Sequence, residues 1–364
     1  MPKRLCRGCS EHLCKNCSER FGCPREHLYL VVDDWSSGYN IRKINLSSGS
    51  GEGAVQCLPP GFMNVEAERG VSEFFTSAFG TKIMATHPNL PEFPVPIIDL
   101  DRKTILPGPE TNCPAHPIYF PVGNKVYALD IGTFEVCHWQ PNPTFSPLAE
   151  NNWRWCQLQR PLFSRLRICS YAVNEQKQTI FVSIKGDTVA TFSFDIGESM
   201  WERYGQWALP FNDRGYYDRD LDGYVGLSKD PESLGYLYFC DMTRTDTDSR
   251  LCPCPVVERS KVKVFNKNPA EIHLSATLMY MHHSKFCIVE CVSVDDVKAD
   301  QALHELSGTE ASSGSIYMYR VITFTIRYNR RSDLKVKNYR VQCYKVPREA
   351  TSELIHEDPV AFWL

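Results

Sequence analysis

The sequence has no apolar run that approaches the roughly 18 residues needed to span a bilayer. Its first residues, MPKRLCRGCSEHLC, have no apolar core of the kind that a signal peptide requires, and Glu11 and Glu19 argue against an organelle transit peptide. The 364 residues are 43% hydrophobic and 23% charged, which suits a globular protein with a substantial core. We therefore expect no membrane insertion and a cytoplasmic or nuclear location.

Excess charge of one sign is also lacking, because 40 basic and 43 acidic residues leave a formal net charge of −3. A chain with this balance has no general attraction to nucleic acid or to an anionic membrane. Recognisable catalytic motifs are absent too: the sequence has no nucleophile elbow, no phosphate-binding glycine loop and no Ser, His and Asp constellation. These absences favour a binding protein over an enzyme.

No stretch of useful length has the apolar period of an amphipathic helix. From about residue 27 onward, short runs rich in β-branched and aromatic residues alternate with turn clusters, and 24 prolines and 21 glycines punctuate them. Gly123-Asn124 and Lys185-Gly186-Asp187 have the composition of tight hairpin turns. The sequence predicts an all-β protein.

One short unit recurs along the chain. In TFSFDIGESMWERYGQW a strand ends at Phe194-Asp195, turns through Ile196-Gly197 and resumes with Trp201. The Asp side chain can accept hydrogen bonds from the amides of such a turn. We identify related turns at positions 45, 101, 130, 241 and about 327.

The recurrence predicts a kelch-like β-propeller of about six degenerate four-stranded blades, in which the aromatic residue after the turn packs between neighbouring sheets. Trp153, Trp155, Trp201 and Trp207 are then fillers between blades rather than ligand platforms. The double glycine that opens typical kelch blades is missing almost everywhere, and the turns are unevenly spaced. A pair of β-sandwiches is therefore the structural alternative.

Three segments resemble a family of grass proteins that is defined by a domain of unknown function, DUF1668. They are HLYLVVDDWSSGYNIRKINL, TFSFDIGESMWERYGQWALPFNDRGYYDRDLDGYVGL, and KFCIVE with YMYRVITFTIRYNRRSDLKV. The resemblance covers about residues 27–347. It implies a plant protein with a kelch-like propeller fold and no established enzymatic activity, and it supplies no catalytic residue.

The 16 cysteines divide into two groups. Several lie in apolar strand patterns, where a reduced thiol behaves as a small hydrophobe: Cys169, Cys240, Cys287 and Cys291. Four others form the pattern Cys-x2-Cys-x4-Cys-x2-Cys near the N-terminus: Cys6, Cys9, Cys14 and Cys17. Two such pairs can direct four thiolates at one Zn²⁺, with His12 or Cys23 as a substitute ligand. The short spacer leaves a disordered or redox-labile tail as the alternative.

Two further motifs favour structural roles. Asp218-Arg219-Asp220-Leu221-Asp222-Gly223 matches the first half of a calcium loop, but Lys229 stands where a bidentate Glu is needed. His282-His283 lies in a strand-like pattern, and adjacent side chains of a strand point to opposite faces, so the two rings cannot readily share a metal. The sequence Cys252-Pro253-Cys254-Pro255 predicts an extended loop tip that carries two thiols.

The pattern divides the chain into a Cys-rich extension (1–26), a propeller (27–347) with a polar insertion (292–314), and a tail (348–364). The insertion is expected to hold one short helix from Val297 to Leu306, and the tail, which ends in Phe362-Trp363-Leu364, to pack against the ring or a partner. We expect a non-enzymatic module that binds another protein through propeller loops or the Cys-rich extension, in protein turnover, defence or reproductive compatibility.

A metal-dependent enzyme that uses the propeller channel is the alternative function. A weaker alternative is nucleic-acid binding through the basic N-terminus and a basic strand segment, comprising Arg327, Arg330, Arg331, Lys335 and Lys337.

Overall fold

Short antiparallel strands account for nearly all regular structure in the described part of the chain. The computed structural model describes residues 27–46, 54–67, 74–86, 95–109, 114–139, 153–242, 251–265, 268–294, 316–328, 334–350 and 357–364. Within these ranges the only helices are two three-residue 3-10 turns, η1 (Arg165–Arg167) and η2 (Pro231–Ser233). A membrane-spanning helix is therefore not found among the described residues.

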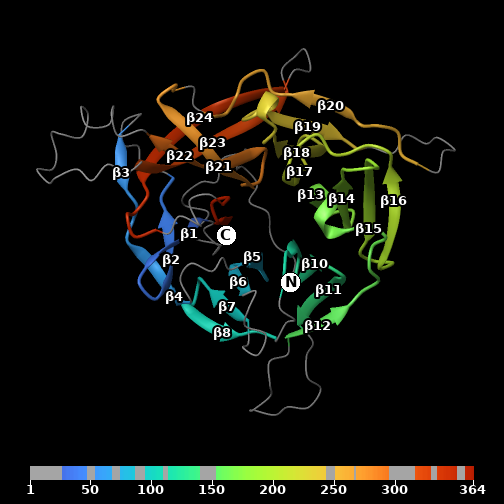
Figure 1. Ribbon diagram of the computed structural model, residues 1–364, viewed down its shortest axis with the longest axis horizontal. Helices are drawn as coiled ribbons and strands as arrows, with labels where there is room; N and C mark the ends of the chain where they lie inside the picture. The colour runs from blue at the N-terminus through green and yellow to red at the C-terminus, as the bar shows by residue number, and fades with distance from the viewer. Residues whose placement is uncertain are drawn as a thin grey trace, which may run out of the picture.

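The strands form five sheets arranged in a ring (Figure 1). The first sheet has the order β25 (Ala361–Trp363), β1 (Leu28–Trp35), β2 (Gly38–Ile44) and β4 (Gly61–Glu66). The second comprises β5 (Phe74–Ala78), β6 (Lys82–Thr86), β7 (Pro96–Asp99) and β8 (Thr104–Pro107). The third comprises β9 (Ile118–Val122), β10 (Lys125–Asp130), β11 (Thr133–Trp139) and β12 (Trp153–Gln157).

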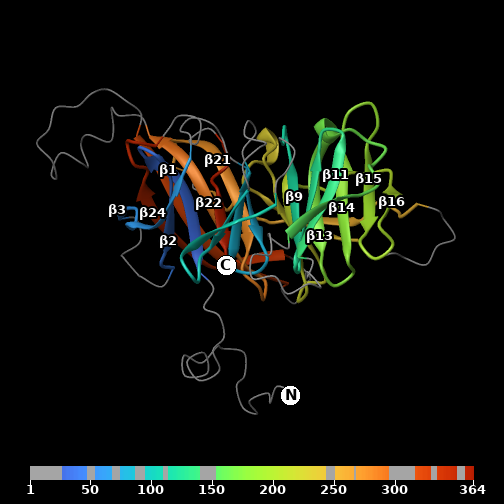
Figure 2. The same ribbon diagram turned by 90° about the horizontal axis from the view of Figure 1, so that it is seen from below.

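The fourth sheet has eight strands. They are β13 (Ile168–Asn174), β14 (Thr179–Ile184), β15 (Ala190–Asp195), β16 (Met200–Gly205), β17 (Asp213–Asp218), β18 (Gly223–Leu227), β19 (Leu237–Asp241) and β20 (Val256–Arg259). The fifth comprises β21 (Glu271–Tyr280), β22 (Lys285–Val294), β23 (Ile316–Tyr328), β24 (Leu334–Lys345) and β3 (Val55–Cys57). Figure 2 shows that the strands run from one face of the ring to the other.

Two strand pairings join the beginning of the described chain to its end. β25 pairs antiparallel with β1, so that Leu30 lies opposite Ala361, and the C-terminus lies at the centre of the ring (Figure 1). β3 pairs in parallel with the outer strand β24. The expected apolar tail therefore packs against the ring. A closed ring of twisted sheets is a β-propeller, which confirms the predicted fold class.

Kelch-type repeats and the number of blades stay predictions. Two antiparallel four-stranded meanders make up the eight-stranded sheet, and a parallel pairing of their first strands, β13 and β17, joins them. The number of blades thus depends on whether this sheet is counted once or twice. Phe211 fills the space beside the junction, where a Cβ added to Gly226 would lie 2.1 Å from its ring. The close approach of this ring explains the glycine.

Aromatic residues fill the spaces between sheets, as predicted. Trp201 lies 5.2 Å from Phe134 of the neighbouring third sheet and 5.1 Å from Phe194, measured between ring centroids. Trp153 stacks on Phe79, in the turn between β5 and β6, with ring centroids 3.7 Å apart. These rings are the large apolar groups that hold adjacent blades together, because one blade alone cannot bury both of its faces.

The recurrent turn has the predicted chemistry but not a uniform place. Asp195 Oδ1 accepts hydrogen bonds from the amides of Gly197 and Glu198, at 2.8 and 2.9 Å. This turn joins the third and fourth strands of its meander, whereas the Asp130 turn joins the second and third strands of its sheet. In the second sheet the residue that accepts the turn amide is Asp99, not Asp101. The motif thus predicts a turn that an Asp side chain stabilises, but it does not predict which strands of a blade that turn connects.

The described strands also bear on the predicted insertion. β22 continues to Val294, which lies opposite Ile316 of β23, so residues 292–294 belong to the sheet. The expected helix from Val297 to Leu306 and the Cys-rich extension 1–26 lie outside the described residues.

Candidate functional site

A cavity of about 1000 Å³ lies along the axis of the ring. The inner strands β5, β9, β13, β17, β21 and β25 all contribute residues to its wall. Its lining is mixed in character, with Tyr171, Arg214, Tyr280 and the C-terminal residue Leu364 among its residues. Because propeller channels collect side chains from every blade, this cavity is the first place to look for a functional site.

A lysine in the cavity wall is held between two carboxylates. Lys229 Nζ lies 2.7 Å from Asp213 Oδ2 and also forms an ion pair with Asp358, which lies just before β25. Burial by itself would lower the pKa of Lys229, but the two carboxylates outweigh it and raise that pKa above its ordinary value. The lysine therefore stays charged and ties the C-terminal segment to the β17–β18 side of the channel.

Two motifs that the sequence analysis treated separately meet at one end of the channel. Asp218, at the end of β17, is fully buried, and its Oδ1 accepts hydrogen bonds from the amides of Asp220 and Leu221, both at 2.9 Å. The same oxygen accepts a 3.0 Å bond from Ser284 Oγ, which follows His282-His283. Asp218 thus closes its own turn and ties the β17–β18 turn to the β21–β22 turn.

The histidine pair does not lie in a strand, which corrects the sequence prediction. His282, His283 and Ser284 have φ angles of 64°, 51° and 55°, and together they form the left-handed turn between β21 and β22. His283 Nδ1 lies 3.6 Å from Asp220 Oδ2, and both side chains are largely exposed. Three consecutive left-handed residues are strained, and strain of this kind persists only where surrounding contacts hold it. The Asp218–Ser284 bond is such a contact.

We expect Asp218→Ala to destabilise the protein by about 3 kcal/mol or more, because the substitution leaves two amides and one hydroxyl without their buried acceptor. Urea unfolding measures the change. Asp220→Ala is the matched control: its side chain is 55% exposed, so the loss should stay within about 0.5 kcal/mol. Equal midpoints for the two variants would contradict the structural role of Asp218.

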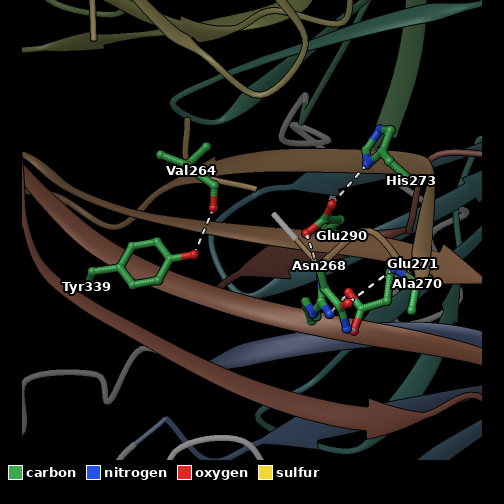
Figure 3. Close-up of polar contacts among 8 residues, drawn as sticks. Val264, Asn268, Ala270, Glu271, His273, Glu290 and Tyr339 are labelled. Carbon is green, nitrogen blue, oxygen red and sulfur yellow. Dashed lines mark hydrogen bonds and ion pairs between the residues drawn. The ribbon is translucent and has the colours of Figure 1, made fainter. Parts of the chain in front are cut away.

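A second group of charged side chains is buried between strands of the fifth sheet (Figure 3). Glu290 Oε1 lies 3.0 Å from His273 Nδ1, and Arg320 forms ion pairs with both Glu271 and Glu290. Burial raises the pKa of Glu290, although the contact with His273 partly offsets that rise. Glu290 and Arg320 are 1% and 4% exposed. The group therefore fastens the sheet internally and is closed to ligands.

Sequence reasoning missed this group, although a signal was present. Glu290 interrupts the apolar run FCIVECV, and Arg320 interrupts YMYRVITF. A charge inside a buried strand requires a partner of opposite sign. The two residues lie directly opposite each other in the β22–β23 pairing.

Of the four cysteines that were predicted to be small buried hydrophobes, Cys240, Cys287 and Cys291 are buried, whereas Cys169 is only half-buried. Cys287 and Cys291 are fully buried in the core of the fifth sheet, and burial raises the pKa of each thiol to about 12. Cys252 does not lie at an exposed loop tip, because it is buried and its carbonyl accepts the Trp207 Nε1 hydrogen bond at 3.1 Å. Its neighbour Cys254 is exposed.

The predicted zinc ligands all lie outside the described residues: Cys6, Cys9, Cys14, Cys17, His12 and Cys23. Zinc binding stays a prediction. Among the residues that the structure does describe, no group of three or more His, Cys, Asp or Glu side chains is placed to hold a metal ion. Of the basic segment, Arg327 and Lys335 are exposed and lie opposite each other on the β23–β24 hairpin.

Solved structures that are similar to this chain include two propeller-like proteins. The first is the periplasmic gluconolactonase PpgL of Pseudomonas aeruginosa, with 10% identity and a TM-score of 0.42 over 88% of this chain and 99% of that chain. The second is the Cps50 (Swd1) β-propeller domain of Myceliophteria thermophila, with 6% identity and a TM-score of 0.40 over 86% and 92%. Similarity this distant carries no argument about function.

Curated proteins give no match to this sequence. The family described as "Protein of unknown function (DUF1668)" matches residues 25–344, which is most of the chain. The matched residues contribute to all five sheets, and β25 is the strand that lies outside them. The match agrees with the resemblance of the three segments quoted above. The chain therefore belongs to the DUF1668 family of proteins of unknown function.

Proposed function

We propose that this protein is a non-enzymatic interaction module that binds a partner protein through the loops of its propeller. The observation that carries the proposal is the complete exposure of Leu162, in the connection between the third and fourth sheets. Leu166, in η1 and four residues further along the chain, is 67% exposed. Exposed leucines that the fold does not bury are typical of interaction sites when they lie together.

The charged groups around the channel add support. Lys229 is paired with two carboxylates, and Asp218 Oδ1 accepts hydrogen bonds from the amides of its own turn and from Ser284. These side chains have structural partners, so the geometry assigns them to holding the ring together. The loops at the rim are then the natural place for recognition, as on other rigid scaffolds.

Affinity capture with the intact chain as bait tests the proposal. We expect the bait to retain a partner protein at about 0.15 M salt, a concentration that screens loose electrostatic contacts. The two should then co-elute in size-exclusion chromatography with a fixed ratio. Baits that lack residues 1–26 or 296–314 separate the contribution of these segments from that of the ring; the second deletion spares β22 and β23. Failure of every bait to form a complex of fixed ratio would count against an interaction module.

A further inference from the structure

The connection that leads into β13 presents an unusual surface, which we call the Leu162 surface. It consists of exposed or half-buried residues on two adjacent segments: Arg160, Leu162, Leu166, Arg167, Lys185 and Val189. The Lys185 amide donates a 3.0 Å hydrogen bond to the Arg167 carbonyl, so the connection and the β14–β15 turn lie side by side. This bond joins Arg167 to Lys185, and the other four residues lie within seven positions of one of these two along the chain.

The backbone of this surface is fixed. Phe163 packs against Phe192 and Trp201, at centroid distances of 4.6 and 5.3 Å. Ser164 Oγ accepts a hydrogen bond from the Leu166 amide at 3.3 Å, which caps η1. Phe163 is thus an inward anchor, and it holds the neighbouring Leu162 in solvent. A partner that covers Leu162 does not have to order a loose loop, which lowers the entropic cost of binding.

The surface is also basic, in a chain whose net charge is −3. Arg160 and Lys185 are exposed, and neither has an ion-pair partner among the residues that the structure describes. Arg167 lies 3.6 Å from Asp187, but this carboxylate is 99% exposed, and exposed pairs of this kind are weak. The neighbouring Arg165 is half-buried; burial lowers the pKa of its guanidinium, and the charges of Asp130 and Asp213 oppose that shift.

We propose that the Leu162 surface binds an acidic segment of a partner protein that carries leucine-type side chains along one face. The inference rests on the proposed function and names the chemistry of its partner. Leucines of the partner cover Leu162, Leu166 and Val189, while its carboxylates approach Arg160, Arg167 and Lys185. An amphipathic acidic helix has this combination of groups.

Other anionic partners fit less well. A phosphate backbone pairs with the basic side chains but leaves the two exposed leucines in water. An anionic bilayer attracts basic residues, yet three apolar side chains offer little area for insertion, and the rest of the chain is acidic in balance. An acidic segment with leucines accounts for both the charge and the exposed apolar side chains.

The test uses a fluorescent peptide of about 16 residues, long enough to form helix on a surface, with leucines three and four positions apart and glutamates between them. Binding to the full chain is followed by fluorescence anisotropy. We expect Leu162→Ser with Leu166→Ser, and separately Arg160→Glu with Lys185→Glu, to weaken binding at least about 10-fold each. Added salt should also weaken binding.

The matched control changes one exposed valine and one exposed lysine elsewhere, Val256→Ser with Lys335→Glu, and should alter affinity less than about 2-fold. All variants replace exposed residues, and unchanged circular dichroism checks their fold. The proposal is overturned if the peptide does not bind at about 1 mM, the level of the weakest specific complexes. It is also overturned if a peptide with lysine in place of glutamate binds equally well.

Two further probes test the rejected partners. The chain is mixed with phosphatidylserine vesicles and, separately, with single-stranded DNA. If either probe binds the chain but not the two double variants, the Leu162 surface binds a membrane or a nucleic acid, and the proposal is overturned. The capture experiment tests the proposed function independently of the Leu162 surface. A partner that both double variants retain refutes the Leu162 surface alone, whereas a failure of all baits refutes the interaction module.

Discussion

Removal of Pro359–Leu364 is expected to open the ring and to lower the free energy of unfolding by roughly 5 kcal/mol or more. The segment supplies β25, which pairs with β1, and its Pro359 carbonyl accepts a 2.7 Å hydrogen bond from Thr277 of β21. Trp363 packs in the core shared by the first and fifth sheets. A loss of this size is a large share of the about 5–15 kcal/mol that stabilises an ordinary domain.

Urea unfolding, followed by tryptophan fluorescence and by circular dichroism, measures the effect of this truncation. We expect a midpoint far below that of the full chain, and transitions that no longer coincide between the two probes. Ile105→Ser on the outer strand β8 is the control, since its side chain is 46% exposed and its loss should stay within about 0.5 kcal/mol. An unchanged midpoint after truncation would show that β25 does not close the ring.

Arg320→Ala is expected to cost about 3–5 kcal/mol of stability, because it leaves the carboxylates of Glu271 and of the buried Glu290 without their guanidinium partner. His273 remains as a neighbour of Glu290, but it bears a full charge only when protonated. Chemical denaturation at pH 7 gives the loss. Arg340→Ala on the adjacent strand β24 is the matched control, since Arg340 is exposed and the expected change is within about 0.5 kcal/mol.

A second substitution identifies the cause of that loss. Glu290→Gln in the Arg320→Ala background removes the more deeply buried of the two uncompensated charges and should recover at least about 1 kcal/mol, which a double-mutant cycle detects. Lowering the pH should act in the same direction. The pKa of Glu290 is raised in the folded protein, so the protonated form is favoured there, and stability associated with this group is lost as the pH rises through that pKa. If neither Glu290→Gln nor a lower pH restores stability, the loss in Arg320→Ala comes from packing and not from an unpaired charge.

The sequence predicted the elements whose causes are local. The turn at Asp195 forms because one carboxylate reaches two amides within three residues. Strands such as β18 and β22 are buried along almost their whole length, because each blade packs against a neighbour on both of its faces. Tryptophans in an all-β chain are large apolar groups that must be covered, so their place between sheets followed as well. The position of each Asp turn within its blade could not be predicted from the sequence, because such turns join different pairs of strands in different sheets.

The closure by β25, the parallel pairing of β13 with β17 and the contact of Asp218 with Ser284 were decided by tertiary structure alone. Each joins residues that are far apart along the chain, and the sequence around either partner fits many pairings equally well. Alternation and turn chemistry act over a few neighbouring residues, so the amino-acid sequence by itself determined an all-β chain with buried aromatics. The partner of each strand depends on which faces and edges remain open once the others have packed, and only the closed ring settles that choice.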